Sequence, residues 1–325
     1  MTTRISVVIP CFNAEPFLRQ AVESLRATQY PDLEIIIFDD GSTDGSLDLA
    51  HQLAREYPGI LVFTHPDRVN RGPGVTRNAA VKKSSGEYLA FLDADDYVLP
   101  TRFLGSARIL DESPDIDAVC GTTERLIEPG GEERGKRIRP RTVFDCRDPD
   151  RVLEHRLFKG LAWSTNAILL RRAAFDRAGG FSERRTGEDA VLWLKLACVA
   201  RIASAGPDPI AIYRICPWDN WDEYLKRPFE PHNSLVVSEA LAWARKNGIR
   251  KEYLNLLLRA LEARTLLDNR RLREDLRYSA AFRHLGRQML DHPSLSLRGG
   301  IWRGITCTML EGLRMRKPAF EKTDE

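Results

Sequence analysis

The stretch Ile5-Ser6-Val7-Val8-Ile9-Pro10 is a short β-branched run that ends at a proline, and Leu33-Glu34-Ile35-Ile36-Ile37-Phe38 is a second run of this kind. Both runs are typical of strands that are buried on two faces. Between them, residues 15–28 carry apolar side chains at helical spacing. A strand, a helix and a strand in this order form a βαβ unit, which predicts a parallel sheet flanked by helices.

The alternation of strands and helices continues well beyond this unit. We expect helices near 45–56, 74–84, 101–112 and 188–198, and strands near 60–64, 87–92, 117–121, 165–170, 200–204 and 209–213. From about residue 232 the sequence changes to amphipathic segments at 232–247, 250–268 and 271–290, with no strand candidates. We therefore predict two domains, an α/β domain over 1–230 and a helical, basic region over 231–325.

Composition and charge exclude several classes of protein. The 325 residues are 43% hydrophobic, which excludes disorder, and a net charge of +3 is too small to indicate wholesale binding to nucleic acid or a membrane. The charge is uneven, because residues 241–325 hold 18 Lys and Arg against 10 Asp and Glu, a net +8, which leaves −5 for residues 1–240.

The sequence also predicts where in the cell the protein is located. Six cysteines without a C-x-x-C pair, and a start that leads directly into a strand, predict a cytoplasmic protein with reduced thiols. No window of about 18 apolar residues free of charges occurs, so we expect no transmembrane helix. The six histidines show no metal-ligand spacing and are expected to be surface or structural residues.

Polar residues follow three of the expected strands. They are Pro10-Cys11-Phe12-Asn13, Asp39-Asp40-Gly41-Ser42 and Asp93-Ala94-Asp95-Asp96. Ligands bind at the carboxyl ends of strands in open α/β sheets. The three turns should therefore converge on one crevice.

The cluster Asp93, Asp95 and Asp96 predicts a cation. Like charges this close repel unless a ligand neutralises them, and Mg²⁺ or Mn²⁺ held by one or two carboxylates usually completes its shell with phosphate oxygens. A bound diphosphate is thereby implied. An Asp-rich turn that caps the next helix is an open alternative. The same alternative applies to the run Asp39–Gly45, which otherwise offers a carboxylate to a base or ribose.

Several of these blocks together resemble a known family. They are Ser6-Val7-Val8-Ile9-Pro10-Cys11-Phe12-Asn13, Asp39-Asp40-Gly41-Ser42-Thr43-Asp44, Asn70-Arg71-Gly72, Arg77-Asn78-Ala79-Ala80, Gly86-Glu87-Tyr88, Leu92-Asp93-Ala94-Asp95-Asp96, Gly179-Gly180-Phe181-Ser182-Glu183 and Gly187-Glu188-Asp189. In order and spacing they resemble glycosyltransferase family 2, whose members have the GT-A fold and use nucleotide-diphosphate sugars. The resemblance covers roughly residues 4–214, and the last 110 or so residues lie outside it.

The resemblance implies a fold and roles for individual residues. The fold would be a GT-A-type, Rossmann-like and mostly parallel sheet flanked by helices, with a C-terminal helical appendage. The nucleotide-sugar site would comprise Pro10, Phe12 and Glu15 as lining, Asp40 at the base with Asp39 beside it, Arg71 and Arg77 at the diphosphate, and Asp93 near the ribose with Ala94 next to it. Asp95 would coordinate Mn²⁺ or Mg²⁺. Asp189 would be the catalytic base, with Glu188 beside it shaping the acceptor site.

The expected activity is metal-dependent, inverting transfer of a sugar from a nucleotide-diphosphate sugar, with UDP as the expected nucleotide. The acceptor would be a glycan, a lipid-linked compound or another hydroxyl, in polysaccharide or glycoconjugate biosynthesis. A carboxylate that takes the hydroxyl proton and a cation that stabilises the departing diphosphate fit this chemistry. A non-catalytic nucleotide-sugar-binding or scaffold protein with the same fold is the alternative. A nucleotidyltransferase is disfavoured, because Pro10-Cys11-Phe12-Asn13 is not a Gly-rich phosphate loop.

The basic C-terminal region has two interpretations. The clusters at 270–273 and 314–317, with Trp302 as an interfacial anchor, would suit peripheral contact with anionic lipids on the cytoplasmic face of a membrane, or a polyanionic acceptor. A solvated helical face with i,i+4 ion pairs is the favoured alternative.

Overall fold

The computed structural model describes residues 2–127, 137–138, 149–158, 163–215, 232–274, 278–297 and 299–314. The chain forms two compact units, Met1–Trp221 and Asp222–Glu325. The sequence placed the domain boundary between residues 230 and 231, which lie outside the described residues.

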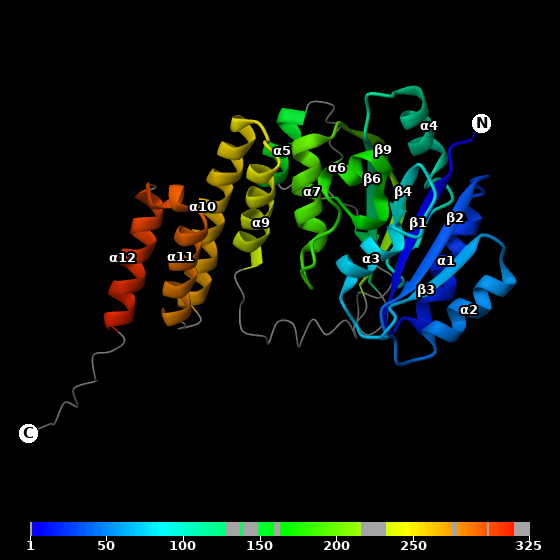
Figure 1. The fold of residues 1–325 in the computed structure, drawn as a ribbon, viewed down its shortest axis with the longest axis horizontal. Helices are drawn as coiled ribbons and strands as arrows, with labels where there is room; N and C mark the ends of the chain where they lie inside the picture. The colour runs from blue at the N-terminus through cyan, green and yellow to red at the C-terminus, as the bar shows by residue number, and fades with distance from the viewer. Residues whose placement is uncertain are drawn as a thin grey trace, which may run out of the picture. The chain divides into compact units, whose positions relative to one another are not determined.

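The first unit begins with the predicted βαβ unit (Figure 1). Strands β1 (Ile5–Cys11) and β2 (Leu33–Asp39) pair in parallel along their whole lengths, and α1 (Glu15–Ala27) connects them. Every β1 residue except Pro10 is buried, which explains why the strand is apolar apart from Ser6. The helix buries its apolar face, Leu18, Ala21, Val22 and Leu25, against the sheet. These predictions are confirmed.

Two more crossovers complete the parallel half of the sheet. They are built from α2 (Ser46–Glu56), β3 (Ile60–Thr64), α3 (Pro73–Val81) and β4 (Tyr88–Phe91). The strand order here is β3-β2-β1-β4, all parallel. In Figure 1, α1 and α2 lie on one side of this sheet and α3 lies on the other. The carboxyl ends of these strands therefore share one edge.

The second half of the unit is mixed in direction. Its elements are β5 (Tyr97–Val98), α4 (Leu104–Glu112), β6 (Ala118–Ile127), β7 (Arg137–Ile138), α5 (Pro149–Phe158), η1 (Thr165–Ala167), β8 (Ile168–Arg171), α6 (Arg172–Ala178), α7 (Glu188–Val199) and β9 (Ile202–Ile215). The sheet continues from β4 as β8-β6-β9-β5, with β8 antiparallel to both neighbours and β6 parallel to β9. The predicted fold class is confirmed, with parallel pairing concentrated in the first half.

One expectation about the sheet is wrong in detail. We expected two strands at 200–204 and 209–213, but β9 is a single strand over Ile202–Ile215. Gly206 adopts φ +104°, and the register with β6 shifts between Cys120 and Thr123. An irregularity of this kind bends a strand without ending it. The glycine and prolines of this segment therefore mark a bulge and not a turn.

The second unit is helical, as the sequence predicted. It contains α9 (His232–Lys246), α10 (Lys251–Glu274), α11 (Tyr278–Asp291), η2 (Pro293–Leu297) and α12 (Gly299–Arg314). The helix expected to end at 268 instead continues to Glu274, because Asp268 and Asn269 are buried inside the bundle. Asn269 donates to Ala281 O at 3.0 Å and accepts from Thr308 Oγ1 at 3.0 Å. No helix among the described residues is long and apolar enough to span a membrane.

Candidate active site

The turns after β1 and β2 are tied together by their own polar groups. Asn13 adopts φ +50°, its amide donates to Ser42 Oγ at 3.0 Å, and its Oδ1 accepts from the Thr43 amide at 2.8 Å. Glu15 accepts from the Gly45 amide at 3.0 Å, so this carboxylate holds the start of α2. Of the two other residues predicted here, Pro10 is half-buried and Phe12 is 47% exposed at the edge of the sheet.

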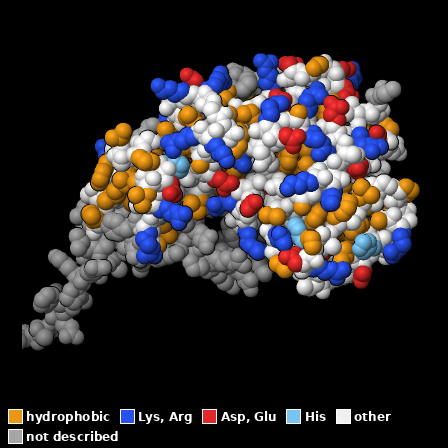
Figure 2. Space-filling model, viewed as in Figure 1, with side chains coloured by type: hydrophobic (Ala, Val, Ile, Leu, Met, Phe, Trp, Pro, Cys, Tyr) orange, Lys and Arg blue, Asp and Glu red, His pale blue; other side chains and the backbone are white. Residues whose placement is uncertain are grey.

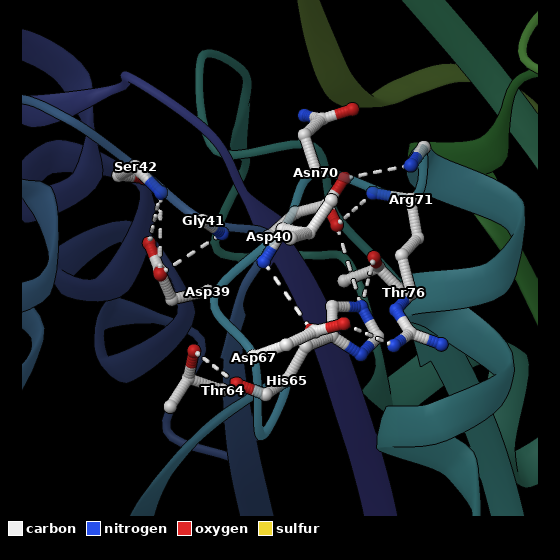
Figure 3. Close-up of polar contacts among 12 residues, drawn as sticks. Asp39, Asp40, Gly41, Ser42, Thr64, His65, Asp67, Asn70, Arg71 and Thr76 are labelled. Atoms are coloured by element: carbon white, nitrogen blue, oxygen red, sulfur yellow. Dashed lines mark hydrogen bonds and ion pairs between the residues drawn. The ribbon is translucent and has the colours of Figure 1, made fainter.

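Asp39 and Asp40 are both buried and both accept backbone N–H groups. Asp39 accepts from the amides of Gly41 at 3.1 Å and Ser42 at 3.3 Å. These bonds close a turn, which is what the alternative interpretation of the run Asp39–Gly45 expects. Asp40 accepts from the amides of Arg71 at 2.8 Å and Gly72 at 2.9 Å, one at each carboxylate oxygen (Figure 3). Asp40 thereby positions the loop that leads into α3.

His65 belongs to this network and was not singled out in the sequence. Its Nε2 lies 3.3 Å from Asp40 Oδ1 and 3.1 Å from Thr76 Oγ1, and the residue is 5% exposed (Figure 3). The available signal was its position directly after β3, at the same sheet edge as the polar turns. The predicted diphosphate ligand Arg71 lies nearby, is 45% exposed, and pairs with Asp67 at 2.7 Å.

Arg77 on α3 joins two regions that are far apart in the sequence. One Nη donates to Asp93 Oδ1 after β4, and the other donates to Glu188 Oε1 at the start of α7, at 2.7 Å. The guanidinium is 4% exposed and lies 5.1 Å from the centre of the Phe181 ring. Burial alone would lower the pKa of Arg77, but the carboxylates of Asp93 and Glu188 raise it above its ordinary value.

The predicted acidic cluster divides into a buried and a more open part. Asp96 is 2% exposed and accepts from Asn166 Nδ2 and the Arg214 amide, each at 2.8 Å. Burial, reinforced by the charges of Asp95 and Asp93, raises the pKa of Asp96 well above its ordinary value. The side chain of Asp93 is 31% exposed, Asp95 is half-buried, and Ala94 between them is buried.

Arg214 of β9 contacts the acidic cluster, a role that was not predicted from the sequence. Its guanidinium lies 4.9 Å from the centre of the Phe17 ring and 5.5 Å from that of Tyr97. Nε donates to the backbone oxygen of Asp95 at 2.8 Å, and Nη2 donates to Gln20. The signal was a cation directly after the run Ile210-Ala211-Ile212-Tyr213, and a buried cation requires buried partners.

Glu188 and Asp189 open α7 after Gly187, which adopts φ +71°. Burial raises the pKa of Glu188, Arg77 opposes this rise, and the charge of Asp189 adds to it. Asp189 is half-buried, and its Oδ1 accepts from the Ala190 amide at 2.6 Å. The helix N-terminus favours negative charge at this position.

A cavity of about 590 Å³ lies beside the loop that Asp40 holds. It is lined by Phe38, Phe63, Thr64, His65, Pro66, Arg71, Val75, Asn78, Ala79, Lys82, Lys83 and Glu183. Of the predicted site residues only Arg71 contributes to it, so this cavity does not outline the acidic cluster.

The chain resembles known proteins in sequence and in structure. The family model described as Glycosyl transferase family 2 matches residues 6–177. An uncharacterized glycosyltransferase, YibD, of Escherichia coli (strain K12) is 41% identical over 102 residues, which are 31% of this chain and 29% of the relative. The match thus spans less than a third of the length of that curated relative.

Two solved structures share the fold. S. aureus TarS 1-349 in complex with UDP-GlcNAc has a TM-score of 0.61 at 18% identity, with 89% of each chain covered. The mannosyltransferase PcManGT from Pyrobaculum calidifontis, in complex with GDP-Man and Mn²⁺, has a TM-score of 0.57 at 17% identity, covering 98% of this chain and 89% of the other. At these identities the likeness concerns the fold.

Proposed function

Because the chain belongs to glycosyltransferase family 2, we propose that it transfers a sugar from a UDP-sugar to an acceptor hydroxyl, with inversion and with Mn²⁺ or Mg²⁺ as cofactor. UDP is chosen because the TarS structure, which has the higher TM-score of the two neighbours, holds UDP-GlcNAc. The acceptor is a glycan or a lipid-linked hydroxyl compound. The alternative is a protein of the same fold that binds the nucleotide sugar without transferring it.

The observation that carries the proposal is the double ion pair of Arg77. Asp93 belongs to the donor side in the proposed assignment, and Glu188 adjoins the proposed base, Asp189. One buried guanidinium contacts both carboxylates. This contact supports the assignment of one reaction centre to residues that lie 95 positions apart, Asp93 and Glu188.

On the donor side, the residues divide into ligands and positioning groups. Phe12 and Arg71 are exposed at 47% and 45%, so they are proposed to contact the nucleotide and the diphosphate. Pro10 and Ala94 contribute the walls, and Asp93 serves the ribose. Glu15, Asp39 and Asp40 already accept backbone N–H groups, which supports a role in shaping the loops around the nucleotide. Arg77, expected at the diphosphate, is paired with two carboxylates and is proposed to act by orienting Asp93 and Glu188.

The acidic cluster fits a hard divalent cation. Carboxylate oxygens are the preferred ligands of Mg²⁺ and Mn²⁺, and the charges of Asp95 and Asp93 add to the effect of burial in raising the pKa of Asp96. Among the described residues no group of three or more His, Cys, Asp or Glu side chains is arranged to hold a metal alone. Asp95 is therefore proposed as the protein ligand, with donor phosphate oxygens completing the shell. The cation would stabilise charge on the leaving diphosphate.

On the acceptor side, Asp189 is proposed to take the proton of the attacking hydroxyl. It lies in the first turn of α7, where the helix dipole attracts negative charge. Glu188 is held by Arg77 and is proposed to shape the acceptor site.

The test combines donor binding with product analysis. Thermal unfolding is measured with UDP, GDP and their sugars, with and without Mn²⁺, because a ligand at 100 times its dissociation constant adds about 2.7 kcal/mol to stability. The proposal expects a metal-dependent shift selective for uridine ligands, and a product of inverted anomeric configuration by NMR. Binding without transfer or hydrolysis across glycan and lipid-linked acceptors would instead support the non-catalytic alternative.

A further inference from the structure

Large apolar side chains are exposed at one turn of the C-terminal unit. Leu290 at the end of α11 is 82% exposed, Leu297 in η2 is 88% exposed, and Trp302 in the first turn of α12 is 52% exposed. In the first unit, no described large apolar side chain exceeds the 56% exposure of Leu104. Figure 2 shows hydrophobic side chains gathered over this end of the C-terminal unit.

The exposed apolar side chains lie in a segment that is held by its own buried residues and hydrogen bonds. Leu295 and Ile301, which alternate with the exposed residues, are fully buried, and Leu295 N donates to His292 O at 2.9 Å. The indole Nε1 of Trp302 donates to Ser296 O at 2.7 Å, which leaves the apolar ring on the surface with its polar atom satisfied. The chain thus holds three apolar side chains outward while it buries others beside them.

Arginines surround this apolar group. Arg283, Arg287 and Leu290 follow helical spacing on α11, so they share its exposed face, and Arg303 is exposed next to Trp302. Two acidic side chains lie close to this segment, because Asp291 is 3.5 Å from Arg287 and Glu262 of α10 lies against Gly300. We define the α11–α12 patch as Arg283, Arg287, Leu290, Leu297, Trp302 and Arg303.

We propose that the α11–α12 patch docks on an anionic membrane surface. Leucine and an interfacial tryptophan enter the boundary between headgroups and acyl chains, and flanking arginines bind lipid phosphates. Charge decides against a second copy of the chain, because a symmetric contact would bring the arginines of the two copies together. The net charge of +8 over residues 241–325 adds long-range attraction to the same surface. The inference does not depend on the proposed transfer reaction.

The test uses the full chain and sedimentation with vesicles of phosphatidylcholine alone or mixed with phosphatidylglycerol. The wild type should bind the anionic vesicles, more weakly as salt is raised, and Leu297→Gln should weaken binding about tenfold. Leu104→Gln is the matched control, because it removes an exposed leucine of the first unit. Arg287→Gln should also weaken binding, whereas Arg108→Gln, in another exposed i,i+4 pair, should not.

Two further measurements distinguish a membrane from a second copy of the chain as the partner of the α11–α12 patch. Tryptophan emission should shift to the blue on adding anionic vesicles, and Trp302→Phe should remove most of that shift. Wild-type protein that stays in the supernatant with anionic vesicles, or a Leu297→Gln variant that binds as tightly as the wild type, would overturn the proposal. Light scattering that shows a dimer lost in Leu297→Gln would assign the patch to a second copy instead.

Discussion

The imidazole of His65 lies 3.3 Å from the carboxylate of Asp40, which in turn accepts the amides of Arg71 and Gly72 (Figure 3). The end of β3 is thereby connected, through two buried side chains, to the loop that starts α3. Gly72 adopts φ +90°, a conformation that other residues rarely take. The loop therefore combines a backbone conformation that suits glycine with backbone hydrogen bonds to a buried carboxylate.

We predict that His65→Ala raises the donor KM about tenfold, which corresponds to about 1.4 kcal/mol, because Asp40 loses its contact with the imidazole and holds the loop before α3 less firmly. The kcat should change much less, since His65 does not contact the acceptor side. His65→Gln, which keeps a donor, should restore part of the affinity. The control is His51→Ala, an exposed histidine on α2. Equal losses in kcat and in donor binding would argue against a positioning role.

Arg77 should be required for both stability and catalysis. Arg77→Ala leaves Glu188, at 9% exposure, without its countercharge, and we expect a loss of about 3 to 5 kcal/mol in the free energy of unfolding. Arg77→Lys should keep more of the stability but little of the activity, because one ammonium group does not reproduce the fork that contacts two carboxylates. Denaturant unfolding and initial rates measure the two effects. Arg108→Ala, an exposed ion pair, should cost under about 1 kcal/mol, and a similar small cost for Arg77→Ala would contradict the prediction.

Glu188 predicts a pH dependence of stability. Its folded-state pKa is raised above the ordinary value of 4.5, mainly by burial, so the folded state binds more protons than the unfolded state above that pH. The contribution of Glu188 to stability should therefore be greatest at low pH and fall as pH rises from about 4.5 through the folded pKa. Glu188→Gln should flatten this slope, while Glu112→Gln, which is exposed, should leave it unchanged. A slope that is identical in wild type and Glu188→Gln would show that this carboxyl does not titrate as described.

Asp189→Asn should lower kcat about 10²- to 10⁴-fold while donor binding is kept, because only the proposed proton acceptor is removed. Donor affinity is read from the thermal shift with UDP and Mn²⁺, and the rate from product formation. Glu183→Gln removes an exposed carboxylate in the same segment and should retain most of the activity. Transfer by Asp189→Asn at a near wild-type rate would assign the base to another residue.

The sequence predicted local features well and contacts between distant elements poorly. The βαβ start and the acidic strand ends were predictable, because patterns of consecutive residues indicate buried strands and capped turns. The ion pair of Arg77 with Glu188 was not predictable, since Glu188 lies 111 positions away and only the fold brings the two residues together. We had assigned Arg77 to the diphosphate, and its burial between two carboxylates adds a positioning role that charge type alone does not indicate.

Buried polar residues caused the remaining errors. The helix expected over 250–268 continues to Glu274, and the polar residues at its expected end, Asp268 and Asn269, are fully buried within α10, where Asn269 bonds to the neighbouring helices. His65 similarly carried no spacing pattern in the sequence. In each case the decisive fact is which buried partner satisfies the polar group, and this depends on tertiary packing.

Arg214 gives the last prediction, on the metal. Its guanidinium packs against Phe17 and Tyr97 and donates to the backbone oxygen of Asp95, so it fixes the segment that carries the proposed metal ligand. Arg214→Lys keeps the charge but not the planar contacts, and we expect the apparent Mn²⁺ affinity to fall about tenfold, as is typical for residues that orient metal ligands. Mn²⁺ is titrated in the presence of UDP, with thermal unfolding as the readout. Arg201→Lys, an exposed residue just before β9, is the control. If Arg214→Lys lowers stability but leaves the Mn²⁺ titration unchanged, Arg214 supports the fold alone, and Asp95 is positioned by its own strand end.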